Sequence, residues 1–162
     1  TIYGAQALGQ EGVDKRIDVI ATAIRGNLTI YDLQEIEVAY APPYNAAKDP
    51  VNILGYVAEN MLNDDVRLIN YDQLDEYLAA ENGILIDVRT KTEFENGAIP
   101  NAIHMDVDTL RENLDFFDKN KKYVIYCQIG LRGYLAQRIL RNNDIDSVNL
   151  NGGYGLWKPV NS

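Results

Sequence analysis

Apolar side chains recur at helical spacing through much of the first part of the chain. Residues 13–25 carry them on one face and are followed by Gly26-Asn27, which predicts an amphipathic helix that ends there. Thr29 is placed to cap a short second helix over residues 30–36. A third helix is predicted from Asp49-Pro50 onward, with proline at its first position. Its apolar face is expected to consist of Ile53, Leu54, Val57 and Met61.

The remaining segments of this first region follow other patterns. Residues 1–9 form an apolar run that predicts a strand. Residues 39–50 hold three of the chain's five prolines, which excludes regular secondary structure there. The polar residues 63–65 then separate two differently patterned regions. We therefore expect one part at residues 1–62, a linker at 63–65, and a second part at 66–162.

From residue 66 onward, apolar strand patterns alternate with helix patterns. Strands are predicted at residues 66–69, 84–89, 102–105, 123–127 and 147–150, and helices at 71–83, 90–97, 107–117 and 133–144. Alternation with short connections predicts an α/β fold, in which helices cover both faces of a parallel sheet. The run at 84–89 is apolar on both faces, as in a central parallel strand. Functional sites in such sheets form beyond the carboxyl ends of the strands.

Composition and charge narrow the classes of function. Hydrophobic residues make up 46% of the 162, which allows a packed core. The net charge is -9, and both parts are acidic, so neither offers the basic face that duplex nucleic acid requires. We see no run of about 18 apolar residues and no secretory signal, so we expect no membrane association and a cytoplasmic location. The chain begins without methionine, which we interpret as a fragment of a longer polypeptide.

The only cysteine in the chain, Cys127, lies at the carboxyl end of a predicted strand. A lone cysteine excludes an internal disulfide and a multi-cysteine zinc site, so no metal is expected. The loop that follows contains Gly130 and Gly133 and leads into a helix, an arrangement that turns backbone N–H groups toward an anion. Arg132 is available as a cation or as a substrate contact, and the thiol is expected to be partly ionised near neutral pH. The alternative is a buried cysteine with a packing role.

Three charged residues, Asp87, Arg89 and Glu93, are predicted near the same rim of the sheet. We expect Arg89 and Glu93 to form an ion pair that stabilises the fold; a substrate contact is the alternative. The sole histidine, His104, is expected to have a packing or surface role rather than to act as a general base. Trp157 is expected to cover one end of the core.

Three motifs of the second part resemble those of the rhodanese family, single-domain sulfurtransferases of α/β fold. The segment CQIGLR at 127–132 resembles the active-site loop of that family. The segment LIDVRTKTEFENGAIPNAIHM resembles its Asp-x-Arg strand, Glu-Phe pair and Gly-x-Ile-Pro-x-Ala turn, and VNLNGGYGLW resembles its Gly-Gly segment and closing helix. The resemblance covers about residues 66–158. Ala98 departs from the family, which commonly has a histidine there, usually regarded as structural.

This resemblance implies a mechanism. Cys127 would take a sulfane sulfur from a donor such as thiosulfate or a persulfide and pass it to a thiol or cyanide. The loop that holds the persulfide would consist of Gln128, Ile129, Gly130, Leu131, Arg132 and Gly133. Cysteine phosphatases, a rival class, place five residues between cysteine and arginine, whereas this chain has four. The shorter loop favours a single sulfur atom over a phosphate or arsenate.

The first part resembles the end of the dimerisation domain in flavin-dependent pyridine nucleotide–disulfide oxidoreductases. The segment YAPPYNAAKDPVN carries most of this resemblance, which points to the coenzyme A-disulfide reductase and NADH oxidase branch. The branch implies FAD, NAD(P)H and coenzyme A in the parent protein, a persulfide or polysulfide reductase activity, and a homodimer. Tyr40 and Tyr44 would be candidates to reach the partner's flavin site, with loop packing as the alternative.

No Gly-x-Gly-x-x-Gly motif is present, so these residues are expected to bind no cofactor themselves. The leading interpretation is a sulfurtransferase module, with a small sulfur-containing substrate, that serves a parent reductase domain. The alternative is a non-catalytic docking or dimerisation module of an NADH oxidase-like flavoprotein.

Overall fold

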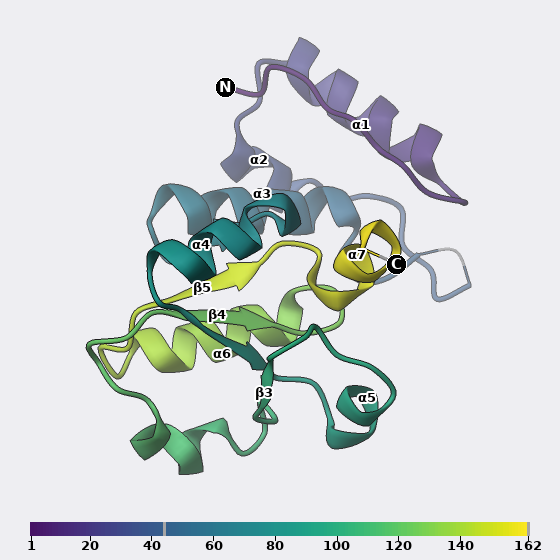
Figure 1. Ribbon diagram of the computed structural model, residues 1–162. Coiled ribbons are helices and arrows are strands. Elements are labelled where there is room, and N and C mark those ends of the chain that lie inside the picture. The colour runs from purple at the N-terminus through teal and green to yellow at the C-terminus, as the bar shows by residue number, and fades with distance from the viewer. Residues whose placement is uncertain (44, 162) are drawn as a thin grey trace. The chain divides into compact units, whose positions relative to one another are not determined.

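The structure, a computed structural model, describes residues 1–43 and 45–161 (Figure 1). The chain forms two compact units, Thr1–Asp64 and Asp65–Ser162. The first unit has one cluster of buried apolar residues and the second has two. Within the described residues, no helix is long and apolar enough to cross a membrane.

The described part of the first unit contains three helices, α1 (Val13–Arg25), α2 (Ile30–Glu35) and α3 (Pro50–Leu62). As predicted, Thr29 caps α2: its hydroxyl accepts a hydrogen bond from Asp32 N, and the Asp32 carboxylate accepts one from Thr29 N. Asp49 opens α3 through the same reciprocal bonds with Asn52. The described residues between 39 and 49 form neither helix nor strand, and Pro50 is the first residue of α3, also as predicted.

Two predictions for the first unit are wrong. Residues 1–9 form no strand, since no other described segment of this unit is a strand that could pair with them. The residues expected on the core face of α3 are instead exposed: Ile53, Leu54, Val57 and Met61. Val51 and Gly55 face α2 in their place, and a Cβ atom on Gly55 would lie 2.8 Å from the carbonyl oxygen of Ile30. The absence of a side chain at Gly55 lets the two helices pack closely.

The second unit is built on a parallel sheet of five strands in the order β1-β5-β4-β2-β3. The strands are β1 (Leu68–Ile69), β2 (Ile84–Asp87), β3 (Ile103–His104), β4 (Tyr123–Tyr126) and β5 (Ser147–Leu150). Strand β4 lies between β2 and β5, and all four of its residues are buried. This confirms the predicted α/β fold with a parallel sheet.

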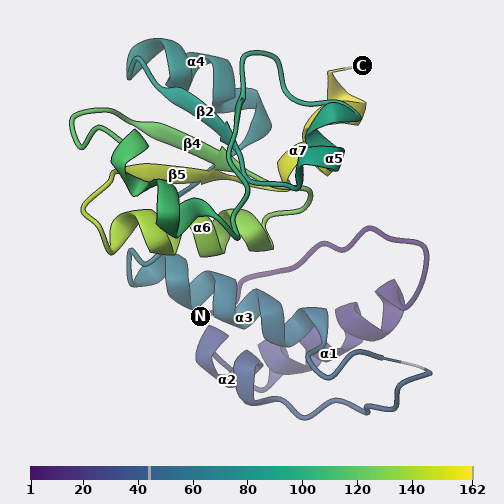
Figure 2. The same cartoon turned by 90° about the horizontal axis from the view of Figure 1, so that it is seen from below.

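Helices cover both faces of this sheet, with α4 and α6 on opposite sides (Figure 2). They are η1 (Tyr71–Gln73), α4 (Leu74–Ala80), α5 (Lys91–Glu95), η2 (Leu110–Phe116), α6 (Leu131–Arg141) and α7 (Gly153–Val160). Consecutive residues of β4 point to opposite faces of the sheet. Ile125 packs in the apolar cluster that contains Leu140 of α6, and Val124 packs in the cluster that contains Leu74 of α4.

The helix predicted at residues 107–117 differs in type from the expectation. It is a 3₁₀ segment, η2, with a non-helical backbone at Asn113. The Asn113 side chain donates a hydrogen bond to the carbonyl oxygen of Thr109 at 2.8 Å. Such local side-chain bonds compete with the α-helical pattern, which the apolar spacing alone does not reveal.

Candidate active site

Cys127 follows directly after the last residue of the central strand β4. The parallel register pairs Tyr126 with Asp87, the last residue of β2, so both strands end at the same edge. The cysteine is only 1% exposed and belongs to the core cluster that faces α6. It therefore lies at the carboxyl edge of the sheet, the region where sites form in parallel α/β folds.

The turn after Cys127 directs a backbone N–H group at its sulfur. Gly130 N donates a hydrogen bond to Cys127 Sγ across 3.1 Å. The backbone of Gly130 has φ 126, a conformation that favours glycine, and it caps helix α6. The first bond within that helix is donated by Tyr134 N to Gly130 O at 2.8 Å, so the N–H groups of the preceding turn have no partner within the helix. Among the described hydrogen bonds, the one from Gly130 N is the bond that reaches the cysteine sulfur.

The start of helix α7 holds the other side of the loop. Tyr154 N donates to Cys127 O and Gly155 N donates to Gln128 O, each at 2.8 Å. Just before these two residues, a Cβ atom on Gly153 would lie 2.3 Å from Cys127 O, and the φ of Gly153 is 54°. Glycine is required there both by the close approach of two backbones and by the left-handed conformation.

Replacing Gly153 with alanine is therefore expected to destabilise the second unit by ~3 kcal/mol, because backbone atoms rather than a flexible side chain block the new methyl group. Denaturant unfolding followed by circular dichroism measures the change. Gly4→Ala is the matched control, since a Cβ atom on Gly4 meets nothing within 4 Å. Equal unfolding midpoints for the two variants would contradict the expectation.

Asn149 of β5 holds the loop after Cys127 through a hydrogen bond to its backbone, a role that the sequence analysis missed. Its side chain is buried, and its Nδ2 donates to Gly130 O at 3.1 Å. A Cβ atom on Gly133 would lie 2.2 Å from Asn149 Oδ1, so the absence of a side chain at Gly133 makes room for this amide. The available signal was a polar residue within a fully buried strand.

Arg132 is held by Glu93 of helix α5. Its Nη1 and Nη2 donate to the two carboxylate oxygens at 2.6 and 2.7 Å, a bidentate arrangement. The bond to Arg132 lowers the pKa of Glu93 to about 2. The pKa of Arg132 is raised, mainly by its hydrogen bond to Glu93 and in smaller part by the neighbouring Cys127. Arg132 thus links Glu93 to the cysteine.

The predicted ion pair between Arg89 and Glu93 is wrong. Arg89 is 2% exposed and pairs instead with the buried Asp87, at 2.7 Å between Nη2 and Oδ2. The two residues are separated by one position at the end of a strand, so their side chains point to the same side. Burial alone would lower the pKa of Arg89, but its hydrogen bonds to Asp87 raise it overall.

Arg89 also connects the segments around the loop. Its Nη2 donates to Gly97 O at 2.7 Å, and its Nη1 donates to Gln128 Oε1 at 3.4 Å. The guanidinium carbon lies 4.1 Å from the centre of the Tyr154 ring. A single buried arginine therefore contacts the loop, helix α7 and the segment after α5.

The outer side of the loop is apolar. Ile129 is 74% exposed and Leu131 is 65% exposed, so both side chains point away from the core beside the cysteine. Gln128 is partly buried. The loop residues singled out from the sequence, 128–133, run from the residue after Cys127 into the first turn of α6.

His104 and Trp157 have packing contacts. The Nε2 atom of His104 lies 2.7 Å from the carbonyl oxygen of Arg89, and its ring contacts Phe94 at 5.1 Å between centroids. Trp157 packs against the core cluster that faces α4 and stacks on Tyr154. These contacts account for both side chains without a catalytic role.

The two tyrosines proposed to contact a partner's flavin site belong to the first unit. Tyr40 is exposed, in the segment between α2 and α3. Tyr44 lies outside the described residues.

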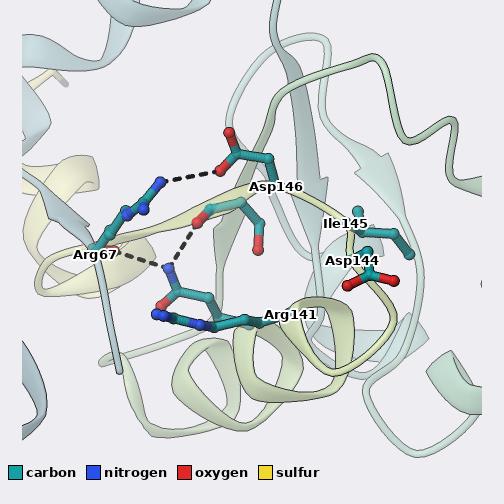
Figure 3. Close-up of a pocket in the computed structure, with 7 residues that line it drawn as sticks. Arg67, Arg141, Asp144, Ile145 and Asp146 are labelled. Atoms are coloured by element: carbon teal, nitrogen blue, oxygen red, sulfur yellow. Dashed lines mark hydrogen bonds and ion pairs between the residues drawn. The ribbon is translucent and has the colours of Figure 1, made fainter. Parts of the chain in front are cut away.

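A pocket of about 400 Å³ lies away from Cys127, at the amino ends of β1 and β5 (Figure 3). Arg67 and Asp146 face each other across it, 3.4 Å apart. It contains no residue of the loop at 127–133.

Among the described residues, no group of three or more histidine, cysteine or acidic side chains is arranged to hold a metal ion. The chemistry of the candidate site therefore centres on Cys127 and the N–H groups around it.

Comparison with known families now places the second unit. The Rhodanese-like domain family matches residues 70–159, more than half of the chain. The chain belongs to the rhodanese-like family. This confirms the resemblance inferred from the motifs around Cys127.

Two solved structures extend the similarity of this rhodanese-like chain beyond the second unit. Reduced CoADR-RHD from Bacillus anthracis is 43% identical, with a TM-score of 0.88, over 94% of this chain and 27% of that one. The NAD-dependent persulfide reductase from A. fulgidus is 38% identical, with a TM-score of 0.81, over 92% of this chain and 26% of that one. Since neither unit alone makes up such a share, both units have counterparts in each of these proteins.

The chain is also similar in sequence to a coenzyme A disulfide reductase. Coenzyme A disulfide reductase from Staphylococcus aureus (strain bovine RF122 / ET3-1) is 55% identical over 58 residues, which is 36% of this chain. The matched segment spans only 13% of that protein's length. The rhodanese-like chain thus has relatives among reductases that are much longer than itself.

Proposed function

We propose that Cys127 accepts a sulfane sulfur atom and carries it as a persulfide, as a sulfurtransferase module does. The main support is the 3.1 Å hydrogen bond from Gly130 N to Cys127 Sγ. A cysteine that only fills a core needs no such donor, whereas a thiolate or persulfide anion is stabilised by it. Membership of the rhodanese-like family supports the same chemistry.

In the proposed reaction, the Cys127 thiolate attacks the outer sulfur of a donor R–S–SH. A new S–S bond forms on Cys127, the S–S bond of the donor breaks, and its electron pair leaves with the thiolate RS⁻. An acceptor thiolate then attacks the outer sulfur of the Cys127 persulfide and restores the Cys127 thiolate. No oxidant or reductant is consumed in either step. The fixed N–H groups of the loop would stabilise the negative charge on sulfur throughout.

Phosphatase chemistry fits the site less well. A phosphate-binding loop uses its arginine to grip two oxygens of the substrate. Here both terminal nitrogens of Arg132 are already bound to the Glu93 carboxylate. This observation agrees with the four-residue spacing between Cys127 and Arg132 in favouring sulfur transfer.

We further propose that the module acts within an NAD(P)H- and FAD-dependent reductase of coenzyme A disulfides, persulfides or polysulfides. The similarity over both units to the CoADR-RHD and persulfide reductase structures supports this. The chain lacks a Gly-x-Gly-x-x-Gly turn, so it does not fit FAD or NAD(P)H itself. Those cofactors would be bound by other residues of such a reductase, and the sequence of the full-length protein should contain that motif.

Residues 1–62 are proposed to be part of a dimerisation domain, with Tyr40 as a candidate contact to the partner's flavin site. The exposed position of Tyr40 and the exposed apolar residues of α3 support an interface in this unit. Light scattering on the full-length protein should give the mass of a homodimer. A monomeric mass at micromolar concentration would contradict this proposal.

Incubation with a sulfane-sulfur donor is expected to add one sulfur atom to Cys127. The full-length protein is treated with thiosulfate or an alkyl hydropersulfide, and peptide mapping by mass spectrometry locates the added mass. An acceptor thiol should remove it again, which separates a transferable persulfide from irreversible oxidation. If Cys127 gains no sulfur from either donor, the proposed function is wrong.

A further inference from the structure

The Glu93 carboxylate is fixed in place before any substrate binds. Its Oε2 accepts hydrogen bonds from Thr90 N at 3.0 Å and from Thr90 Oγ1 at 2.9 Å, in addition to the bond from Arg132 Nη1. Its Oε1 accepts the second bond from Arg132. Both side chains are about two-thirds buried, at 33% and 31% exposed. The carboxylate is thus a counter-ion for the guanidinium, bound through both of its oxygens.

This pairing removes the net charge that Arg132 would otherwise bring to the loop. Arg132 is the only basic residue between Cys127 and Gly133. The exposed side chains beside it, Ile129 and Leu131, are apolar. The loop therefore offers backbone N–H groups and apolar surface to a substrate, with a cation that is already neutralised.

We propose that Glu93 is a specificity-determining residue: by neutralising Arg132, it favours persulfide donors of low charge over the thiosulfate dianion. This inference rests on the proposed function, sulfur transfer to Cys127. A dianion that leaves water for a partly buried site requires compensating positive charge, and a donor of lower charge requires less. The leaving groups differ in the same way. Thiosulfate releases the sulfite dianion as its S–S bond breaks, whereas R–S–SH releases the singly charged RS⁻.

The test compares kcat/KM for thiosulfate with kcat/KM for an alkyl hydropersulfide, with one acceptor thiol, in the full-length protein. In Glu93→Gln, the amide keeps an oxygen that can accept from Thr90, but the charge of Arg132 is no longer balanced. The ratio of the two kcat/KM values is expected to rise about tenfold in favour of thiosulfate, equivalent to about 1.4 kcal/mol. A purely structural role for Glu93 would lower both values together and leave the ratio unchanged.

Two control variants isolate the charge. Glu95→Gln changes a carboxylate on the same helix that pairs with the exposed Lys91 at 3.8 Å, and should leave the ratio unchanged. The double variant E93Q/R132Q removes both charges and should return the ratio toward the wild-type value. A ratio that stays raised in the double variant overturns the proposal, because the effect would then not act through Arg132.

The result does not depend on one variant. Arg132→Gln removes the cation that pairs with the Glu93 carboxylate, so a negative charge beside the loop is no longer balanced. The ratio should then shift in the opposite direction, against thiosulfate. An unchanged ratio in both single variants overturns the inference while leaving sulfur transfer to Cys127 standing. Failure of wild-type Cys127 to take up sulfur from either donor would instead contradict the proposed function.

Discussion

Replacement of Cys127 with alanine is expected to lower sulfur transfer from thiosulfate or a persulfide at least roughly a thousandfold, to the rate of the uncatalysed reaction. The substitution removes the only thiol in the chain, so no other side chain here can form the covalent intermediate. The fold should persist, because the loop is also held by the bonds from Tyr154 N to Cys127 O and from Asn149 to Gly130. Steady-state assays with an acceptor thiol, corrected for the background reaction, measure the loss.

Cys127→Ser is the matched control for this expectation. Its hydroxyl can still accept a hydrogen bond from Gly130 N, so any structural contribution of that bond is retained. Serine is nevertheless expected to be as inactive as alanine, because the reaction requires a thiolate. If the serine variant kept wild-type turnover, Cys127 would have a packing role and the unit would be better regarded as a docking module.

The elements of the second unit were largely predictable from the sequence because its signals are local. The apolar run at 84–89 and the turn residues at Thr90 and Gly97 predict a strand and a capped helix, and the structure has β2 and α5 there. The first unit was less predictable. The apolar residues of α3 indicate a helix correctly, but they do not indicate which face is buried. That face is decided by the close contact at Gly55 with α2.

The position of Cys127 at the carboxyl end of a strand also followed from local patterns, but the partners of the charged residues did not. Arg89 lies at the end of the predicted strand, four positions before Glu93 of the predicted helix, and a pair was expected from this closeness in the chain. In the structure Arg89 lies between the end of β2 and the start of α5, and its side chain turns to Asp87. Glu93 binds Arg132, which is 39 positions away in the chain. Contacts of this kind depend on tertiary packing, which residue spacing does not encode.

Removing the Arg89 side chain's charge is expected to have the largest effect on stability. In Arg89→Met, Asp87 would remain at 0% exposed without its counter-ion, and unfolding of the second unit should cost ~3–5 kcal/mol less than in the wild type. The variant also loses the hydrogen bonds to Gly97 O and to Gln128 Oε1. Sulfur transfer should therefore fall even under conditions in which the variant remains folded. Denaturant unfolding followed by circular dichroism measures the stability.

Two comparisons separate the buried charge from the loss of arginine as such. Arg67→Met removes an arginine that is 52% exposed and paired with Asp146 at 3.4 Å, and should cost at most ~1 kcal/mol. The double variant D87N/R89M removes both charges of the buried pair and should be more stable than R89M alone, since no uncompensated charge is left. If R89M and R67M were equally stable, the buried pair would not be holding the end of β2 against the loop. The position of Cys127 would then depend on the backbone bonds of α7 and on Asn149 alone.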